Sequence, residues 1–479
     1  MRWLIALHRW MGIGLGWLLV AWCISGVVMM YVPYPEVSFE EYVESLPNLE
    51  FGACCGEFPT DYDPGYTVSG FAIEMLADQP VLRVIDSFGG RNAIDLGDGE
   101  PVRAVPADAA RAIATRMSTA SRVDGRLEYL GTVSRDQWTV AGNFDRDRPL
   151  HHFSLNDPEG NEWYLSSTTG ELVQQSTRRE RVWGWFGSVT HWLYPTLLRQ
   201  NARLWSEVVI WSTVAGLFLA VFGTYIGIKQ LRRRRNGRWS PYRGMAWWHH
   251  TLGLVFGVLA LTWLLSGLFS MNPWGLLEGS SARSEVERVR GTAITLGDAM
   301  SWAAGLARYD LPAEVTRVES APLLGRAFLM AYGRNGYRAR LAAETLHEAP
   351  LGEDELHAAA GALLDSGTSI AAAELLEEGD AYYFNHHVTR PFPVYRVIAD
   401  DDERTHYYLD GMSGQLVSKI DSGRRWFRWL HLGLHRLDFT ATMRSRPIWD
   451  VLMLVLMAGV TAICITGTYM GVKYLARRE

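Results

Sequence analysis

The chain has 479 residues, of which 48% are hydrophobic and 20% are charged, and its formal net charge is −6 at pH 7. This length allows two or three domains. The negative charge gives no support to nucleic-acid binding, which uses a strongly basic surface, so nucleic acid is not an expected partner.

Four apolar stretches are long enough to cross a bilayer, which takes about 20 mostly apolar residues. They cover residues 3–31, 206–228, 245–271 and 449–474. No small-x-small cleavage site follows the apolar core of the first stretch, so we expect it to remain as a helix. The sequence therefore predicts a multi-pass membrane protein.

Charges between these stretches predict the orientation. The short loop after the second stretch is rich in arginine: Arg232, Arg233, Arg234, Arg235, Arg238 and Arg243. Short basic loops stay in the cytoplasm. Arginines also precede the fourth stretch on the opposite side, but long domains translocate largely regardless of charge, so the short loop has more weight. Both termini are then cytoplasmic, and two long segments, about 33–205 and 272–448, lie outside.

The two long segments have the composition of mixed α and β domains. Helical spacing occurs at 106–117 and 296–307, and a further helix is predicted from 358–364 and 371–377. Hairpins are predicted where residues 163–165 meet 171–173 and where 405–409 meet 415–417. Two adjacent histidine pairs, His151-His152 and His386-His387, are expected in strands. Neighbours in a strand point to opposite faces, so neither pair is expected to bind one ion.

The four cysteines fall into two groups. Cys23 and Cys464 lie in apolar stretches, whereas Cys54 and Cys55 are adjacent in an external segment. The adjacent pair forms either a vicinal disulfide or two free thiols. No C-x2-C spacing indicates a metal site.

The two halves of the chain repeat one pattern. A shift of 244 aligns Pro149 with Pro393, and the same shift aligns four further pairs or motifs. These are Tyr164-Leu165 with Tyr408-Leu409, Gly170 with Gly414, His191 with His435, and Gly223 with Gly467. A shift of 241 aligns the first apolar stretch with the third. Each half is thus helix, external domain, helix, and the expected fold is a four-helix membrane bundle made of two parallel repeats.

A histidine stands at the same point in the first and third stretches. His8 is followed by Gly12, Gly16 and Ser25-Gly26, and His249 by Gly253, Gly257 and Ser266-Gly267. At 3.6 residues per turn, each histidine shares a helix face with its two glycines. Such glycines can serve close helix packing alone. Because ionisable residues at membrane depth are uncommon and the set occurs twice, we interpret the histidines as a facing pair above space cleared for a planar macrocycle.

His191 and His435 form a second equivalent pair on the outer side, just before the second and fourth apolar stretches. His431 lies one turn before His435 and is an alternative ligand, as His250 is for His249. Wet interfacial histidines among aromatic residues would give the same local pattern. The equivalence of the two halves favours a paired role.

Two histidine pairs at opposite faces of one bundle indicate two stacked cofactors. Paired imidazoles suit haem iron, whereas zinc needs three or four protein ligands. Arg9, Arg181, Arg243 and Arg425 are candidates for contacts with haem propionates. No nucleotide-binding loop is found, so electrons would come from a membrane quinol or a separate donor protein.

The stretches LHRWMGIGLGWLLVAWCISGVV, WHHTLGLVFGVLALTWLLSGLF and YYLDGMSGQLV resemble the PepSY-associated transmembrane family, often labelled iron-regulated membrane proteins. The resemblance covers nearly the whole chain. In the first half Ser166 stands where the PepSY ending has Asp, so that domain is a divergent copy. The family includes bacterial inner-membrane siderophore reductases with two haems in the bundle.

This resemblance implies transfer of electrons to a ferric siderophore in the periplasm, with release of ferrous iron. It also implies that His8 and His249 hold an inner haem b and that His191 and His435 hold an outer one. Two other functions remain open. One is a PepSY peptide- or protein-binding regulator without redox activity, and the other is a transporter subunit, which only the parallel repeats suggest.

The predicted boundaries alternate between membrane and external parts. They are 1–32 (first membrane helix), 33–182 (first periplasmic domain), 183–230 (outer interfacial segment and second helix), 231–244 (cytoplasmic basic loop), 245–272 (third helix), 273–425 (second periplasmic domain), and 426–479 (outer interfacial segment, fourth helix and cytoplasmic tail).

Overall fold

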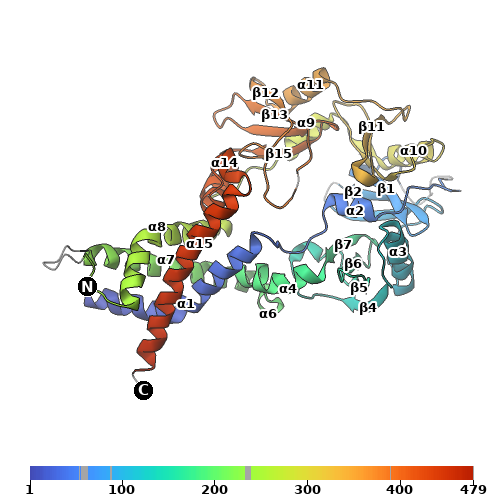
Figure 1. Ribbon diagram of the computed structural model, residues 1–479. Coiled ribbons are helices and arrows are strands. Elements are labelled where there is room, and N and C mark those ends of the chain that lie inside the picture. Colours follow the sequence, from blue (N-terminus) through green and yellow to red (C-terminus); the bar gives the residue numbers. More distant parts are fainter. Residues whose placement is uncertain (53, 56–62, 87–88, 232–238, 389, 478–479) are drawn as a thin grey trace.

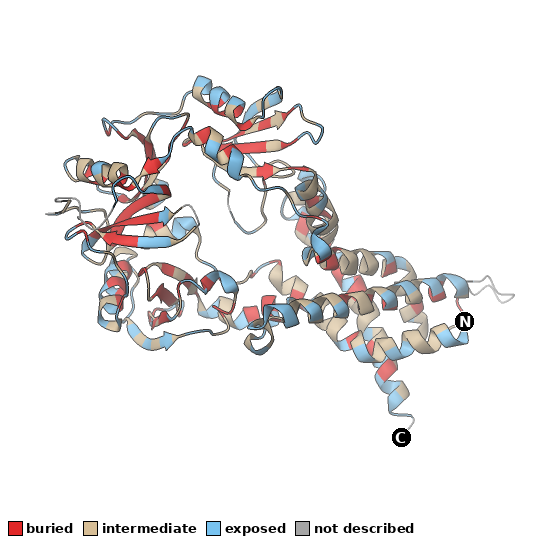
Figure 2. Ribbon diagram, turned by 180° about the vertical axis from the view of Figure 1, so that it is seen from behind, coloured by how far each residue is buried: buried red, intermediate tan, exposed pale blue. Residues whose placement is uncertain are grey.

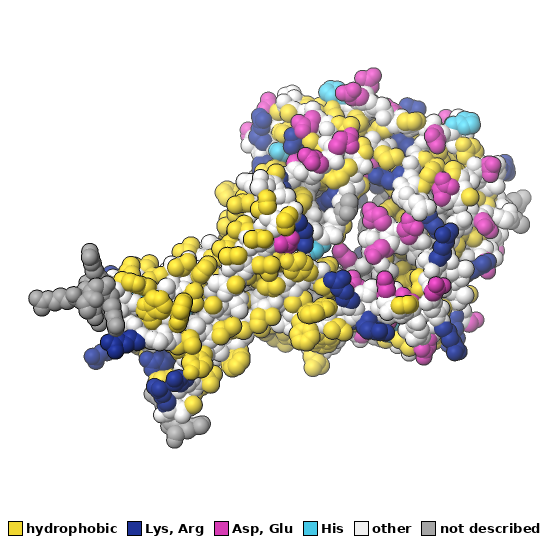
Figure 3. Space-filling model, in the orientation of Figure 1, with side chains coloured by type: hydrophobic (Ala, Val, Ile, Leu, Met, Phe, Trp, Pro, Cys, Tyr) yellow, Lys and Arg dark blue, Asp and Glu magenta, His cyan; other side chains and the backbone are white. Residues whose placement is uncertain are grey.

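Four long helices form one bundle in the computed structural model, which describes residues 1–52, 54–55, 63–86, 89–231, 239–388 and 390–477. They are α1 (Arg2–Met29), α7 (Ala202–Gln230), α8 (Met245–Ser270) and α15 (Ile448–Leu475). All four are long and apolar enough to cross a membrane. On the face shown in Figure 3, hydrophobic side chains are the main coloured type along the bundle, whereas acidic side chains gather on the rest of the molecule. The prediction of four membrane-spanning stretches agrees with these helices.

Small residues set the spacing between the helices. A Cβ added at Gly471 of α15 would lie 2.9 Å from Ile13 of α1, and one added at Gly459 would lie 2.5 Å from the ring of Phe256 in α8. Small residues let helix backbones approach closely where lipid removes the usual hydrophobic driving force. The starts of α1 and α8 and the end of α15 lie at the bundle end that faces away from the sheets (Figure 1).

Segments outside the bundle, from both halves of the chain, share one seven-stranded sheet. Its order is β11-β10-β9-β1-β2-β3, and β8 also pairs with β1. The strands are β1 (Thr67–Leu76), β2 (Gln79–Asp86), β3 (Arg91–Asp95), β8 (Ile294–Thr295), β9 (Val315–Ser320), β10 (Phe328–Gly333) and β11 (Arg338–Ala342). The antiparallel pairing of β1 with β9 joins the first external segment to the second. Sequence analysis did not anticipate this shared sheet.

A buried charge cluster lies where the two halves meet. Glu74 of β1 is fully buried and contacts Arg83 of β2 and Arg317 of β9. Tyr42 donates a hydrogen bond of 2.6 Å to the same carboxylate. A buried charge is tolerated only when it is paired and hydrogen-bonded, so this cluster ties together strands from both halves.

Each half also contains a four-stranded antiparallel sheet with a helix before it. The first is β4 (Glu128–Val133), β5 (Leu150–Ser154), β6 (Glu162–Ser166) and β7 (Leu172–Ser176), after α3 (Ala107–Ala120). The second is β12 (Ile370–Leu376), β13 (Val394–Ala399), β14 (His406–Asp410) and β15 (Leu416–Ile420), after α11 (Glu353–Leu363). Buried residues fill the sheets, while the bundle exposes most of its surface (Figure 2).

Short helices complete the fold. In the first half these are α2 (Phe39–Ser45), α4 (Arg178–Phe186), α5 (Ser188–His191), α6 (Thr196–Arg199) and the 3-10 turn η1 (Gly142–Phe144). In the second half they are α9 (Arg283–Arg290), α10 (Leu296–Leu306), α12 (Ser422–Phe427), α13 (Leu434–Arg436), α14 (Ala441–Arg444), the 3-10 turns η2 (Pro273–Gly275) and η3 (Arg334–Gly336), and the π-helical turn η4 (Arg428–Gly433). Both predicted hairpins are confirmed, as β6–β7 and β14–β15.

Two local predictions are wrong. Residues 371–377 form strand β12 rather than a helix, because hydrogen bonds to β13 outweigh the weak helix propensity of this Ala-Glu-Leu run. His386 and His387 lie in a loop instead of a strand, whereas His151 and His152 lie in β5 as expected. In this loop His386 stacks on Trp449 at 4.0 Å between ring centres.

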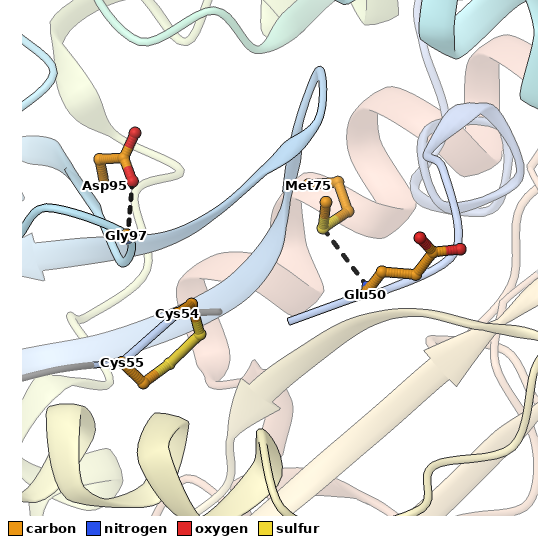
Figure 4. Close-up of a disulfide and its surroundings, with 6 residues drawn as sticks. All are labelled: Glu50, Cys54, Cys55, Met75, Asp95 and Gly97. Atoms are coloured by element: carbon orange, nitrogen blue, oxygen red, sulfur yellow. Dashed lines mark hydrogen bonds between the residues drawn. A yellow bond between two sulfur atoms is a disulfide. The ribbon is translucent and has the colours of Figure 1, made fainter. Parts of the chain in front are cut away.

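Cys54 and Cys55 form a disulfide, which decides between the two possibilities left open by the sequence (Figure 4). The pair packs against the core of the shared sheet, and the backbone N–H of Cys55 donates to the carbonyl of Leu96. Most of the predicted basic loop, residues 232–238, lies outside the described residues.

Candidate functional site

His8 of α1 and His249 of α8 meet near the bundle end that holds the termini. Their ring centres are 6.2 Å apart. Each ring lies against a glycine of another helix: a Cβ at Gly223 of α7 would be 2.7 Å from His8, and one at Gly467 of α15 would be 3.0 Å from His249. No larger residue fits at either position without moving the ring. All four helices therefore build this site.

His191 of α5 and His435 of α13 meet at the other end of the bundle, with ring centres 6.0 Å apart. Ser25 of α1 lies 3.1 Å from Nδ1 of His191, and Ser266 of α8 lies 3.0 Å from Nδ1 of His435. Burial lowers the pKa of His191 to about 4 and lowers that of His435 as well, so both rings are neutral at pH 7. Neutral imidazole is the form that binds metals.

Hydrogen bonds at Nδ1 fix the orientation of these rings. Nδ1 lies 3.1 Å from the Leu219 carbonyl in His8, 3.2 Å from the Ile463 carbonyl in His249 and 3.2 Å from the Trp22 carbonyl in His191. A carbonyl oxygen can only accept, so Nδ1 carries the hydrogen and donates it. Among the described residues, Nε2 of all four histidines has no hydrogen-bond partner, which leaves its lone pair for a ligand.

The ring spacing fits a single metal between each pair. A metal–imidazole bond is about 2.0–2.1 Å and a ring nitrogen lies roughly 1 Å from the ring centre, so two imidazoles on one metal have centres about 6 Å apart. The observed separations are 6.2 Å and 6.0 Å. A donated Nδ1 hydrogen bond is also the usual support of a metal-bound histidine.

One cavity of about 1140 Å³ connects the two pairs and is lined by all four histidines. This volume exceeds the 300–1,000 Å³ typical of small-molecule pockets. Gly12 and Gly253 border it, and a Cβ added at either would meet nothing within 4 Å. Gly16 and Gly257 instead pack against Thr468 and Thr224. The first glycine after each histidine thus borders open space, and the second serves helix packing.

Cationic side chains stand at both ends of the cavity. Arg9, Lys473 and Arg477 line the end that holds the termini, and Arg436 lines the end beside His435. Arg181 and Arg425 are engaged elsewhere, since they donate to carbonyls of Ser176 and Arg404. Of the four arginines expected to contact propionates, only Arg9 lines the cavity. Arg243 does not.

The two alternative ligands, His250 and His431, differ in how their ring nitrogens are bonded. Both nitrogens of His250 are bonded, Nδ1 to Ser240 at 2.8 Å and Nε2 to the Gly227 carbonyl at 2.9 Å. This engagement makes His250 a structural residue. His431 lies in η4, lines the cavity and has its ring centre 5.6 Å from that of His435. Its Nδ1 bonds the Ser266 carbonyl at 2.9 Å and its Nε2 has no hydrogen-bond partner among the described residues, so His431 remains an alternative ligand beside His435.

Sequence analysis missed the residues that support the histidines. Ser25 and Ser266 position the outer pair, and Gly223 and Gly467 make room for the inner pair. The signal was present, because all four belong to the repeated motifs.

No family model matches the chain, and no curated protein matches it.

Proposed function

We propose that this chain is a membrane haem protein that holds one haem b between His8 and His249 and a second between His191 and His435. The observation that carries the proposal is the pairing itself. Four histidines from different elements form two pairs with ring centres about 6 Å apart, and Nε2 of each has no hydrogen-bond partner among the described residues. Helix packing alone gives no evident reason for two such histidine pairs in one apolar cavity.

The donor set suits haem better than a bare metal ion. Each pair offers two imidazoles, which match the two axial positions of haem iron, while zinc needs a tetrahedral set. No cluster of three or more metal-binding side chains occurs among the described residues. The open space at Gly12 and Gly253 accommodates a flat macrocycle, and Arg9 and Arg436 are placed for carboxylates. Haem supplies reversible one-electron chemistry when it is bound.

Matching contacts in the two halves support the proposed duplication and, with it, membership of the PepSY-associated transmembrane family. Tyr164 donates to Asp136 at 2.7 Å, and Tyr408 donates to Asp380 at 2.7 Å. These pairs are related by the same shift of 244 that relates His191 to His435. Ser25 and Ser266 are related by the shift of 241 that aligns the first and third apolar stretches. We propose two parallel repeats, each with a PepSY-like external part.

The charge distribution supports a bacterial inner-membrane orientation with both termini in the cytoplasm. Arg2, Arg243, Lys473 and Arg477 lie near the helix ends of α1, α8 and α15 that face away from the sheets, where basic side chains are visible (Figure 3). Short basic segments remain cytoplasmic. The sheets then lie in the periplasm, next to the outer histidine pair.

We propose that electrons from a membrane quinol or a separate donor are delivered across the bilayer to a ferric siderophore in the periplasm. One electron reduces one Fe(III) to Fe(II), which siderophores bind weakly. The chain orients the imidazoles through Nδ1, keeps the sites apolar and places Arg436 at the outer end. A ferric siderophore in the periplasm would bind on the side of the chain that carries the sheets.

An absorbance spectrum of the purified full-length protein tests the proposal. We expect a Soret band, with sharp α and β bands after dithionite reduction, and two haems per chain by pyridine haemochrome. A colourless protein from haem-replete cells would refute it and would favour the peptide-binding regulator.

A further inference from the structure

Two cysteines meet inside the bundle. Cys54 and Cys55 are bonded to each other, so Cys23 of α1 and Cys464 of α15 are the free thiols. The thiol of Cys23 hydrogen-bonds that of Cys464 and also contacts Thr461. Both cysteines are half-buried and line the cavity. Nothing in the haem assignment uses them.

The helix packing explains why these residues face each other. α1 and α15 run antiparallel, since Gly471 lies against Ile13, Gly16 against Thr468 and Gly26 against Met457. Cys23 falls between Gly16 and Gly26, and it is therefore opposite the turn of α15 that contains Thr461 and Cys464. Glycines on both helices bring the backbones close enough for the two short side chains to meet.

The thiol pair lies between the two histidine pairs. Cys23 is three residues before Gly26, which faces His191, and Cys464 is three residues before Gly467, which faces His249. Three residues correspond to about 4.5 Å along a helix. The pair thus lies between the levels of the two histidine pairs, inside helices that are apolar enough to span a bilayer.

We propose that Cys23 and Cys464 form a reversible dithiol–disulfide couple inside the membrane, with a lipid-soluble quinone as its oxidant. The S–H bonds of both cysteines break and one S–S bond forms. The two electrons and two protons pass to the quinone oxygens, which gives a quinol. This exchange leaves no net charge in a region where an isolated thiolate would be costly. Quinones dissolve in the hydrocarbon layer around the bundle, which is the phase that surrounds helices α1 and α15.

The couple has a structural consequence that does not depend on haem. A disulfide between Cys23 and Cys464 joins α1 to α15 covalently across the cavity wall, between the inner and outer histidine pairs. In the oxidised chain this bond would fix the spacing of α1 and α15 at the level between the two histidine pairs.

Thiol counting on the full-length protein in membranes tests this proposal. Membranes are treated with duroquinone, whose fully methylated ring oxidises thiols but does not add to them. The protein is then denatured without reductant and alkylated with a maleimide. We expect two labelled thiols per chain before oxidation and none after, a mass lower by two hydrogens, and a linked peptide containing Cys23 and Cys464. A phosphine reductant applied to the denatured protein should then expose four thiols, because it also reduces the Cys54–Cys55 disulfide.

A matched variant controls for proximity within the membrane. In C23S/I24C the thiol moves to position 24, which is exposed on the outside of the bundle. This variant should keep both labelled thiols under the same treatment. Retention of both thiols in the unmodified chain would overturn the proposal, as would equal intramolecular linkage in the control. Neither result bears on the haem assignment, which the absorbance spectrum tests separately.

Discussion

The rings of His8 and His249 face each other across two helices, with their centres 6.2 Å apart and Nδ1 of each bonded to a backbone carbonyl of a further helix. One metal bonded to both rings requires about this separation. The same relation recurs between His191 and His435 at 6.0 Å.

Replacing His8 or His249 with Ala should lower the haem content from two to one per chain, because each removes one of two axial ligands. Pyridine haemochrome analysis of protein recovered from membranes measures the ratio. The matched control is His250→Ala, which should keep two haems, since both nitrogens of His250 are already bonded within the protein. Two haems in both H8A and H249A would contradict the inner site.

Gly12→Leu should reduce haem occupancy at the inner site by several-fold without unfolding the bundle. A Cβ at position 12 meets nothing within 4 Å, so the new side chain would extend into the open space that Gly12 borders on the His8 face of α1. Gly16→Leu should instead destabilise the bundle, because position 16 packs directly against Thr468. Haem content and thermal unfolding in detergent separate the two effects. Full occupancy in G12L would mean that the cavity near Gly12 is not the haem space.

Ser266→Ala should alter the outer haem alone. It removes the hydroxyl that lies 3.0 Å from Nδ1 of His435. Loss of such a supporting contact typically lowers metal affinity by about 10–100-fold, and it also changes the reduction potential. Spectroelectrochemical titration should show one of two midpoints shifted and the other unchanged. Ser270→Ala, in the same helix, serves as the control because its hydroxyl bonds only the Gly267 carbonyl. Two unshifted midpoints in S266A would argue against His435 as a ligand.

His435→Ala should abolish reduction of an external ferric siderophore while the inner haem remains reducible by dithionite. Oriented vesicles receive a membrane-impermeant ferric chelate on the periplasmic side, and ferrozine captures the ferrous iron. The inner haem is followed by its α band in the same sample. Undiminished ferric reduction in a variant shown to lack the outer haem would refute the proposed route and would favour a regulatory role.

Glu74→Gln should destabilise the external part by about 3–5 kcal/mol, because it leaves Arg83 and Arg317 buried without their partner. Burial opposes ionisation of Glu74, but the two arginines outweigh it and hold its pKa below the usual value. Since this pKa is lowered on folding, the stabilisation is complete above the ordinary Glu pKa and disappears as the pH falls through the folded-state value. Thermal unfolding between neutral and acidic pH measures it. If the unfolding temperatures of E74Q and of the unmodified chain changed in parallel with pH, this linkage would be excluded.

The sequence by itself determined the elements that depend on local pattern. Apolar runs of membrane length gave the four helices, because a bilayer accepts few other structures. Alternation and turn residues gave the hairpins β6–β7 and β14–β15. The repeated spacing after His8 and His249 singled out the inner histidines, and equivalence under a fixed shift singled out His191 and His435. Identical spacing in two halves is visible without any coordinates.

Only the tertiary structure decided what depends on contacts between distant segments. The pairing of β1 with β9 and the strand at β12 follow from hydrogen bonds to other strands, which outweigh local propensity. Sequence spacing favoured His249 and left His250 as an alternative, and the bonds from His250 to Ser240 and Gly227 show that the His250 ring is committed to packing. The contact between Cys23 and Cys464, which lie 441 residues apart, arises from the antiparallel packing of α1 and α15. Such long-range contacts depend on how whole helices pack, and a local pattern of residue types does not encode that.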